Sequence, residues 1–170
     1  MSVSSDGYIN GPDGSIDWTA PTDELHRFHN QRAAETEVQL LGRRLYETML
    51  VWETEEFTEP AMVEFAELWR PLEKVVFSTT LESVEGSGRL ATRSLAEEIA
   101  ALGDRNIAVG GAGLAASCMR EGLVDDFHLF IVPVVLGGGT PYFPPDVTIS
   151  LDLVETRTFG STVHLRYRRV

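Results

Sequence analysis

The segment from Asn106 to Gly139 constrains the fold more than any other part of the chain. It opens with a short apolar run that stops at Gly110-Gly111, and apolar residues then recur at helical spacing as far as Gly122. A longer and mostly apolar run, from Phe127 to Leu136, follows and ends at three glycines. Strand, glycine turn, helix and strand in this order predict a crossover unit of a largely parallel sheet.

The glycine pair after the first predicted strand also indicates a ligand. Glycine lets a ligand approach the backbone closely, and the N-terminus of the helix that follows favours an anionic group. We therefore expect a nucleotide or another phosphorylated cofactor at this turn.

Length and composition describe an ordinary globular protein. The 170 residues fit one domain, residues 1–170, with 43% apolar and 24% charged residues. The net charge of −12 argues against nucleic acid or an anionic membrane surface as the main partner, although a local basic pocket could still bind phosphate. The single cysteine, Cys118, excludes an intramolecular disulfide. With no signal peptide and no membrane-spanning apolar run, we expect a cytoplasmic protein.

Predicted helices and strands alternate along the rest of the chain. Short strands are expected within 1–9, 38–41, 74–77 and 89–91, and helices are expected to begin near residues 22–23, 43, 61 and 94. Ser94 and Glu97 fit a capping box, whereas the acidic stretch 53–59 is expected to be irregular and solvated. Apolar and polar residues alternate after a turn at 159–161, which predicts a final antiparallel hairpin and hence a mixed sheet.

Three predicted strand ends carry groups suited to phosphate. They are Gly42-Arg43-Arg44, Ser78-Thr79-Thr80 and the stretch from Gly110 to Gly113. Arginine provides planar donors for phosphate, and hydroxyls add hydrogen bonds to it. Because ligands of open α/β sheets lie at the carboxyl ends of the strands, the three ends together predict one groove for a phosphate-bearing ligand.

The stretch from Gly111 to Ala116 also matches the Rossmann pattern G-x-G-x-x-A. The motif comes late in the chain, however, and Asp125-Asp126 precede the next strand instead of following it, where a ribose-binding acid is needed. A true Rossmann domain is therefore not expected.

A family resemblance emerges from motifs spread over nearly the whole chain: SSDGYI, LLGRRLYE, VVFSTTL, GGAGL, GLVDDF, PVVLGGGTPYF and a closing V-x-L-x-Y strand. In this order they resemble the dihydrofolate reductase superfamily. The nearest branch is the C-terminal reductase domain of the bifunctional riboflavin-biosynthesis deaminase/reductase, with its stand-alone relatives. The resemblance implies a three-layer α/β fold, with a mixed, mainly parallel eight-stranded sheet flanked by helices and a C-terminal antiparallel hairpin. It also implies that NADPH binds across the strand ends.

The resemblance further implies roles for individual residues. Gly42 and Arg43 would face the cofactor phosphates, and Ser78 and Thr79 would lie near the adenosine 2′-phosphate. The glycine turn would lie against the nicotinamide and pyrophosphate, with a cis peptide between its two glycines. The full set expected to bind the cofactor is Gly42, Arg43, Arg44, Ser78, Thr79, Gly110, Gly111, Ala112, Gly113 and Leu114.

Two residues depart from the pattern of dihydrofolate reductases. Leu45 stands where those enzymes usually have threonine, which removes one hydroxyl near the pyrophosphate. Thr79 stands where they often have a basic residue, and Arg44 or Arg93 is a candidate to compensate. The preference between NADPH and NADH therefore stays open at this point.

The resemblance also implies a carboxylate on the first long helix that assists protonation of the substrate. Counting forward from Trp18 places it at Asp23, and counting back from Phe28 places it at Glu24. We lean to Glu24 and keep both as candidates. Acidic residues in a first helical turn are also favoured by the helix dipole, whatever the function.

Other polar residues are expected to have structural roles. Asp6 is interpreted as a turn residue that caps local backbone. His26 and His29 are three residues apart, but no third ligand stands at a suitable spacing, so no metal is expected. Packing or surface positions are expected for the remaining candidates: His128, His164 and Cys118.

These features predict an oxidoreductase that uses NADPH to reduce a small polar substrate: a pterin, a ribosylamino-pyrimidine or a related carbonyl or imine compound. No deaminase domain and no Cys/His zinc motif are present, so we do not expect the bifunctional enzyme itself. The alternative is a catalytically silent homodimer that binds nucleotide or a partner. A homodimer is expected in either case, with the strand from Phe127 to Leu136 and the terminal hairpin as its candidate interface.

Overall fold

The computed structural model describes all residues from Met1 to Val170, and the chain divides into two compact units. The first unit comprises residues 1–25 and 118–170, and the second comprises residues 26–117. Two helices, α1 (Asp23–Glu35) and α6 (Ala112–Arg120), contain the boundaries. None of the helices is long and apolar enough to cross a membrane.

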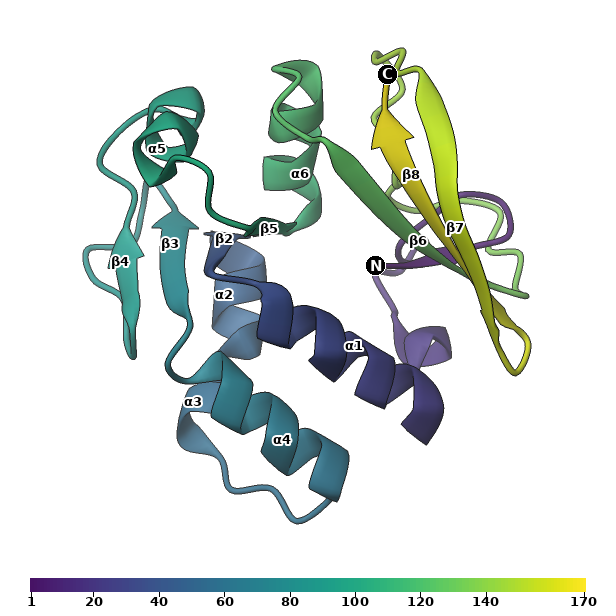
Figure 1. The fold of residues 1–170 in the computed structure, drawn as a ribbon, viewed down its shortest axis with the longest axis horizontal. Coiled ribbons are helices and arrows are strands. Elements are labelled where there is room, and N and C mark those ends of the chain that lie inside the picture. The colour runs from purple at the N-terminus through teal and green to yellow at the C-terminus, as the bar shows by residue number, and fades with distance from the viewer. The chain divides into compact units, whose positions relative to one another are not determined.

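The second unit contains a four-stranded parallel sheet in the order β4-β3-β2-β5 (Figure 1). Its strands are β2 (Val38–Gly42), β3 (Glu73–Phe77), β4 (Gly88–Leu90) and β5 (Ile107–Gly110). The two central strands are apolar and buried, as neighbours on both sides require. Because all four strands are parallel, their carboxyl ends lie at one edge of the sheet.

Of the four helices of this unit, three begin within one residue of where the sequence predicts, and the short helix at 51–54 was not predicted. The four helices are α2 (Arg43–Met49), α3 (Val51–Thr54), α4 (Pro60–Trp69) and α5 (Leu95–Leu102). Pro60 occupies the first turn of α4, and Ser94 and Glu97 form the predicted capping box before α5. The expectation for residues 53–59 is wrong at Glu53, which lies in α3 with its side chain only 11% exposed, because it forms an ion pair with Lys74.

The first unit contains a mixed sheet in the order β1-β6-β8-β7. The strands are β1 (Ser2–Ser4), β6 (Asp126–Val132), β7 (Leu151–Phe159) and β8 (Thr162–Arg169), and a short 3₁₀ helix, η1, spans Asp17–Thr19. β1 runs parallel to β6, and the other pairs are antiparallel, so the terminal hairpin is confirmed. Gly160, with a φ of +57°, provides the left-handed conformation that the hairpin turn requires.

β6 ends at Val132 and not at Leu136, as the apolar run predicted. The reason lies in the backbone hydrogen bonds beyond it. Pro133 has no N–H to donate, and the N–H groups of Leu136 and Gly137 bind the carboxylate of Asp6 instead of a neighbouring strand.

The α/β class, the mixed and mainly parallel strand pairing and the flanking helices are confirmed, but the single eight-stranded sheet is not. The strands form two sheets of four. β1 and β5 are terminal strands of the two sheets, with three and four residues respectively. Strands this short offer few ladder hydrogen bonds through which a sheet could extend.

Candidate functional site

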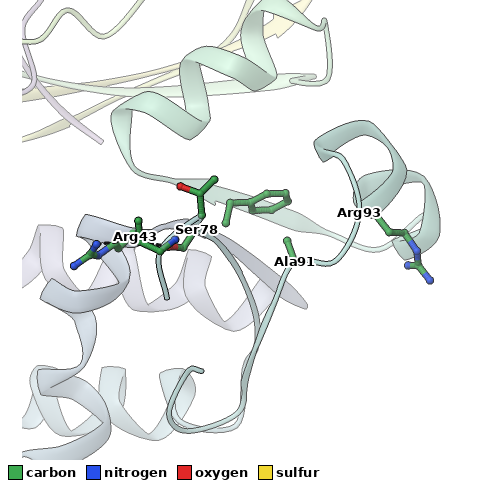
Figure 2. Close-up of a pocket in the computed structure, with 7 residues that line it drawn as sticks. Arg43, Ser78, Ala91 and Arg93 are labelled. Carbon is green, nitrogen blue, oxygen red and sulfur yellow. Dashed lines mark hydrogen bonds between the residues drawn. The ribbon is translucent and has the colours of Figure 1, made fainter. Parts of the chain in front are cut away.

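A pocket of about 480 Å³ lies at the carboxyl edge of the parallel sheet (Figure 2). It is formed entirely within the second unit, by the start of α2, the end of β3 and the segment that follows β4. Its lining residues are Arg43, Phe77, Ser78, Thr79, Thr80, Ala91 and Arg93. Two of the three strand ends predicted to bind phosphate therefore line this pocket, through Arg43 and through Ser78-Thr79-Thr80. The third, from Gly110 to Gly113, does not line it.

Arg43 is held at the pocket by two side chains. Its Nε donates to Glu47 Oε1 at 2.7 Å, one helical turn further along α2, and its Nη1 donates to Thr80 Oγ1 at 2.6 Å. The side chain is 48% exposed. Because a guanidinium has five N–H donors in a rigid plane, these two bonds orient Arg43 and leave further donors for an anion.

Ser78 organises the turn after β3. Its Oγ accepts the N–H groups of Thr80 at 3.1 Å and Leu81 at 3.0 Å, and it lies 3.4 Å from Thr80 Oγ1. This is the local pattern by which serine favours a turn over continued strand. The turn places the hydroxyl groups of residues 78–80 along one wall of the pocket.

Arg93 contributes a second cation. Figure 2 shows Arg43 and Arg93 on opposite sides of Ser78 and Ala91. The lining contains two arginines and three hydroxyl side chains but no carboxylate, in a chain with a net charge of −12. The lining therefore differs in composition from the acidic chain as a whole, and its donors suit a phosphate group.

The expected glycines meet at the ends of β2 and β5. Leu41 pairs with Gly110 across the two strands, and a Cβ on Gly111 would lie only 3.5 Å from the backbone nitrogen of Gly42. Gly111 has a φ of +95°, which side-chain-bearing residues rarely adopt. The other three residues expected here, Ala112, Gly113 and Leu114, form the first turn of α6.

The predicted cis peptide between Gly110 and Gly111 is wrong, since every peptide bond is trans. The chain makes the turn into α6 through the positive φ of Gly111 instead. Glycine at this position gives the backbone the conformational freedom that the turn requires.

Leu45, which stands where dihydrofolate reductases usually have threonine, packs against the glycine turn. A Cβ on Gly110 would lie 2.5 Å from Leu45 Cδ2, so the leucine occupies the space over the glycine. Leu45 also packs against the core cluster that contains Leu41 and Tyr46. Arg44, in contrast, is exposed and does not line the pocket.

Asp23 and Glu24 form the first turn of α1, and both are exposed. Thr22 is the N-cap, since its Oγ1 accepts the N–H of Leu25 at 3.3 Å. Both acids belong to the first unit, whereas the pocket belongs to the second. The assignment of the acid to either residue stays a prediction.

Sequence reasoning missed the two most deeply buried charges, Glu98 and Lys74. Glu98 lies beneath the pocket segment 91–93, and Arg89 binds it through two hydrogen bonds. Arg89 holds the pKa of Glu98 down at about 2, against the opposing effect of burial. One signal was present: Glu98 follows buried Leu95 by three residues, so it falls on the inner face of α5.

The other polar residues occupy structural positions. Asp6 accepts the hydroxyl of Ser4 at 2.7 Å and the N–H of Gly137 at 2.8 Å, so it joins two loops rather than capping only its own turn. The Ser4 hydrogen bond is the main reason that the pKa of Asp6 is lowered. Cys118 is buried as expected, and burial raises its pKa to about 11. His164 is fully buried, and its ring stacks on that of Phe130 with centroids 4.6 Å apart.

Comparisons with known proteins agree with this architecture. The pattern of the RibD C-terminal domain family matches residues 1–165. The uncharacterized protein YyaP of Bacillus subtilis (strain 168) is 33% identical over 171 residues, covering 96% of this chain and 88% of YyaP.

Two solved structures share the fold. A putative riboflavin biosynthesis protein from Shewanella sp. PV-4 superposes with a TM-score of 0.80 at 21% identity, covering 100% of this chain and 96% of that one. Dihydrofolate reductase from Enterococcus faecalis, solved with NADP(H), superposes with a TM-score of 0.65 at 15% identity, covering 99% and 92% of the two chains.

Proposed function

Because the chain belongs to the RibD C-terminal domain family, we propose that it is a reductase that transfers hydride from NADPH to a small polar substrate. The observation that carries the proposal is the pocket at the carboxyl edge of the parallel sheet. Two arginines and three hydroxyl side chains line it without any carboxylate. This donor set fits a phosphate group better than it fits the bare ribose hydroxyls of NADH.

The residues present fit the nucleotide as a whole. Arg43, Ser78 and Arg93 would hold the 2′-phosphate, while Gly42 and the Gly110-Gly111 turn would lie against the pyrophosphate and nicotinamide. These glycines let the ends of β2 and β5 and the start of α6 pack closely together. The N-terminus of α6 therefore lies at this edge of the sheet, where its free N–H groups suit a phosphate group. When bound, NADPH supplies the hydride, and the protein positions it and excludes water.

The proton for the reduced product would come through Asp23 or Glu24. In a reduction of this kind, a carboxyl group supplies a proton to the substrate atom next to the carbon that accepts hydride. Pterins, ribosylamino-pyrimidines and related carbonyl or imine compounds all have a polar double bond of the required kind. We propose this substrate class without choosing among its members.

The test is a titration of the purified protein with NADPH and with NADH, followed by nucleotide fluorescence. Replacing Arg43 with alanine is expected to weaken NADPH binding about tenfold or more, because a charged hydrogen bond to phosphate is lost. Arg105→Ala is the matched control, since Arg105 pairs with Glu73 at the opposite end of β3. Absence of binding for both nucleotides by the unaltered protein would reject the reductase proposal.

The protein is also proposed to form a homodimer. β7 is a terminal strand of its sheet and is nine residues long, with Leu153 58% exposed and Val154 46% exposed. An exposed edge strand offers unpaired backbone groups on which another chain can pair, and exposed apolar side chains favour such a contact. Sedimentation of the protein and of Leu153→Asp tests this point, and a monomer at micromolar concentration for the unaltered protein would contradict it.

The exposed edge strand β7 also fits a second candidate function. In this alternative the protein is a catalytically silent homodimer that binds nucleotide or a partner. Turnover separates it from the reductase. NADPH oxidation with any compound of the proposed class, lost in the double variant D23N/E24Q but with nucleotide binding retained, supports the enzyme. Nucleotide binding without turnover across the class favours the silent dimer.

A further inference from the structure

One buried carboxylate holds the segment that forms the far wall of the pocket. Glu98 on α5 is fully buried. Its Oε1 accepts the backbone N–H groups of Thr92 at 2.9 Å and Arg93 at 3.3 Å. The segment before these residues is tied to the sheet, since the N–H of Ala91 donates to the carbonyl of Val76 at 2.9 Å. Three consecutive N–H groups are therefore fixed, two of them by Glu98.

Arg89 keeps this carboxylate ionised. Its Nη2 lies 2.7 Å from Glu98 Oε2 and its Nη1 lies 3.2 Å from Oε1, a bidentate arrangement. The Arg89 side chain is 40% exposed, so the counter-charge reaches water although the carboxylate does not. Glu98 therefore stays negative throughout the neutral pH range and can accept hydrogen bonds from the segment.

Glu98 also attracts the side chain of Arg93, but weakly. Arg93 Nη1 lies 4.0 Å from Glu98 Oε2, and the Arg93 side chain is 53% exposed. An ion pair at this distance contributes little when its guanidinium is half exposed to water. A backbone N–H bound to a buried carboxylate contributes more and costs more to lose. The main effect of Glu98 on Arg93 is thus to fix its backbone, which leaves the guanidinium available to a ligand.

From this geometry we infer that Glu98 is a positioning residue that holds Arg93 where it meets the phosphate group distinguishing NADPH from NADH. The inference rests on the proposed function. Glu98 does not line the pocket and touches no ligand, and it acts through the backbone of residues 92–93.

The experiment compares Glu98→Gln with Glu97→Gln in the full chain. Glu97 is the neighbouring residue on α5 and is exposed, so Glu97→Gln removes the same charge without touching a buried group. Its side chain belongs to the capping box, a role that glutamine also fills. In Glu98→Gln, the Kd for NADPH is expected to rise about tenfold and the Kd for NADH to change less than about twofold. Glu97→Gln is expected to change neither. An equal loss for both nucleotides would mean a purely structural role and would overturn the inference.

A double-mutant cycle with Arg93→Ala tests whether Glu98 acts through Arg93. In the Arg93→Ala background, Glu98→Gln is expected to have no further effect on NADPH binding. A full additional tenfold loss there would overturn the inference.

A measurement on the unaltered, nucleotide-free protein covers the case in which Glu98→Gln does not fold. The amides of Thr92 and Arg93 are expected to exchange hydrogen slowly, because both bind the buried carboxylate. Fast exchange of both amides would overturn the inference. If the unaltered protein binds neither nucleotide, the proposed function fails, and the exchange experiment still decides whether Glu98 holds the segment.

Discussion

A buried charge binds the chain at each end of β4, and burial has opposite outcomes for the charged forms of these two groups. At the amino end, Lys74 donates to the carbonyl of Trp69 at 2.6 Å and to Ser87 Oγ at 2.8 Å, and it forms an ion pair with Glu53 at 2.9 Å. At the carboxyl end, Glu98 receives the N–H groups that follow β4. β4 has only three residues and lies at the edge of its sheet, so buried charges fix the chain on both sides of it.

The difference lies in the partners. Burial lowers the pKa of Lys74, which means that its charged form is destabilised despite Glu53. The pKa of Glu98 is lowered to about 2, chiefly by Arg89, which means that its charged form is stabilised despite burial. The Glu53 side chain is only 11% exposed, whereas Arg89 is 40% exposed. A buried charge is thus better compensated when its partner keeps contact with water, because only one of the two ions is then fully desolvated.

The largest expected effect is on stability at the amino end. Lys74→Met is expected to lower the free energy of unfolding by about 3–5 kcal/mol, because it leaves Glu53 buried without its partner. Urea denaturation measures this change. The double variant K74M/E53L is expected to recover much of the loss, and an equally unstable double variant would contradict the assignment of the cost to the stranded carboxylate.

At the carboxyl end of β4, the pH dependence of the unfolding free energy tests whether folding stabilises the charged form of Glu98. The pKa of Glu98 falls from 4.5 to about 2 on folding, so the stability that it contributes is present above pH 4.5 and is lost as the pH falls toward 2. This change in pKa corresponds to about 3 kcal/mol of stability. The difference in unfolding free energy between the unaltered protein and Glu98→Gln should shrink by about this amount over that range. Parallel stability curves for the two proteins would show that the shift is absent.

Amine labelling sharpens the comparison because Lys74 is the only lysine in the chain. An amine-reactive reagent has two targets, Lys74 and the α-amino group of Met1. Met1 is 45% exposed and Lys74 only 1%, so Met1 is expected to react at least about a hundred times faster in the native protein. Mass spectrometry of the two peptides gives both rates, with Met1 as the internal standard. Comparable native rates would mean that the lysine site opens readily.

The smallest expected effect concerns the link from Lys74 to β4. Ser87→Ala removes one acceptor of the Lys74 ammonium and is expected to lower the unfolding free energy by about 1 kcal/mol. Ser117→Ala is the control, since the hydroxyl of Ser117 donates to the carbonyl of Gly113 one turn earlier in its own helix. If the two substitutions cost the same, Ser87 does not anchor the start of β4.

Sequence reasoning was most accurate where the signal is local. The strand before Gly42, the capping box at Ser94 and the terminal hairpin were all found from spacing and turn residues within a few positions of each other. It also predicted that Arg43 and the hydroxyls after Phe77 would share a pocket, because carboxyl ends of parallel strands lie at one edge. Hydrophobic periodicity and caps act over one or two turns, so one sequence is enough to detect them.

Sequence alone determined the order of most elements and the strand ends that could bind phosphate. The crossover unit predicted from residues 106–139 is wrong, because β5 and β6 belong to different sheets. Only the tertiary structure showed that the strands form two sheets, that the glycine turn is trans, and that Glu98 holds the wall of the pocket. The ionisation of a buried group depends on which partners surround it and on whether those partners reach water. Arg89 lies nine residues from Glu98, and Glu53 lies 21 from Lys74, so these pairs follow from the folded packing and not from any local pattern.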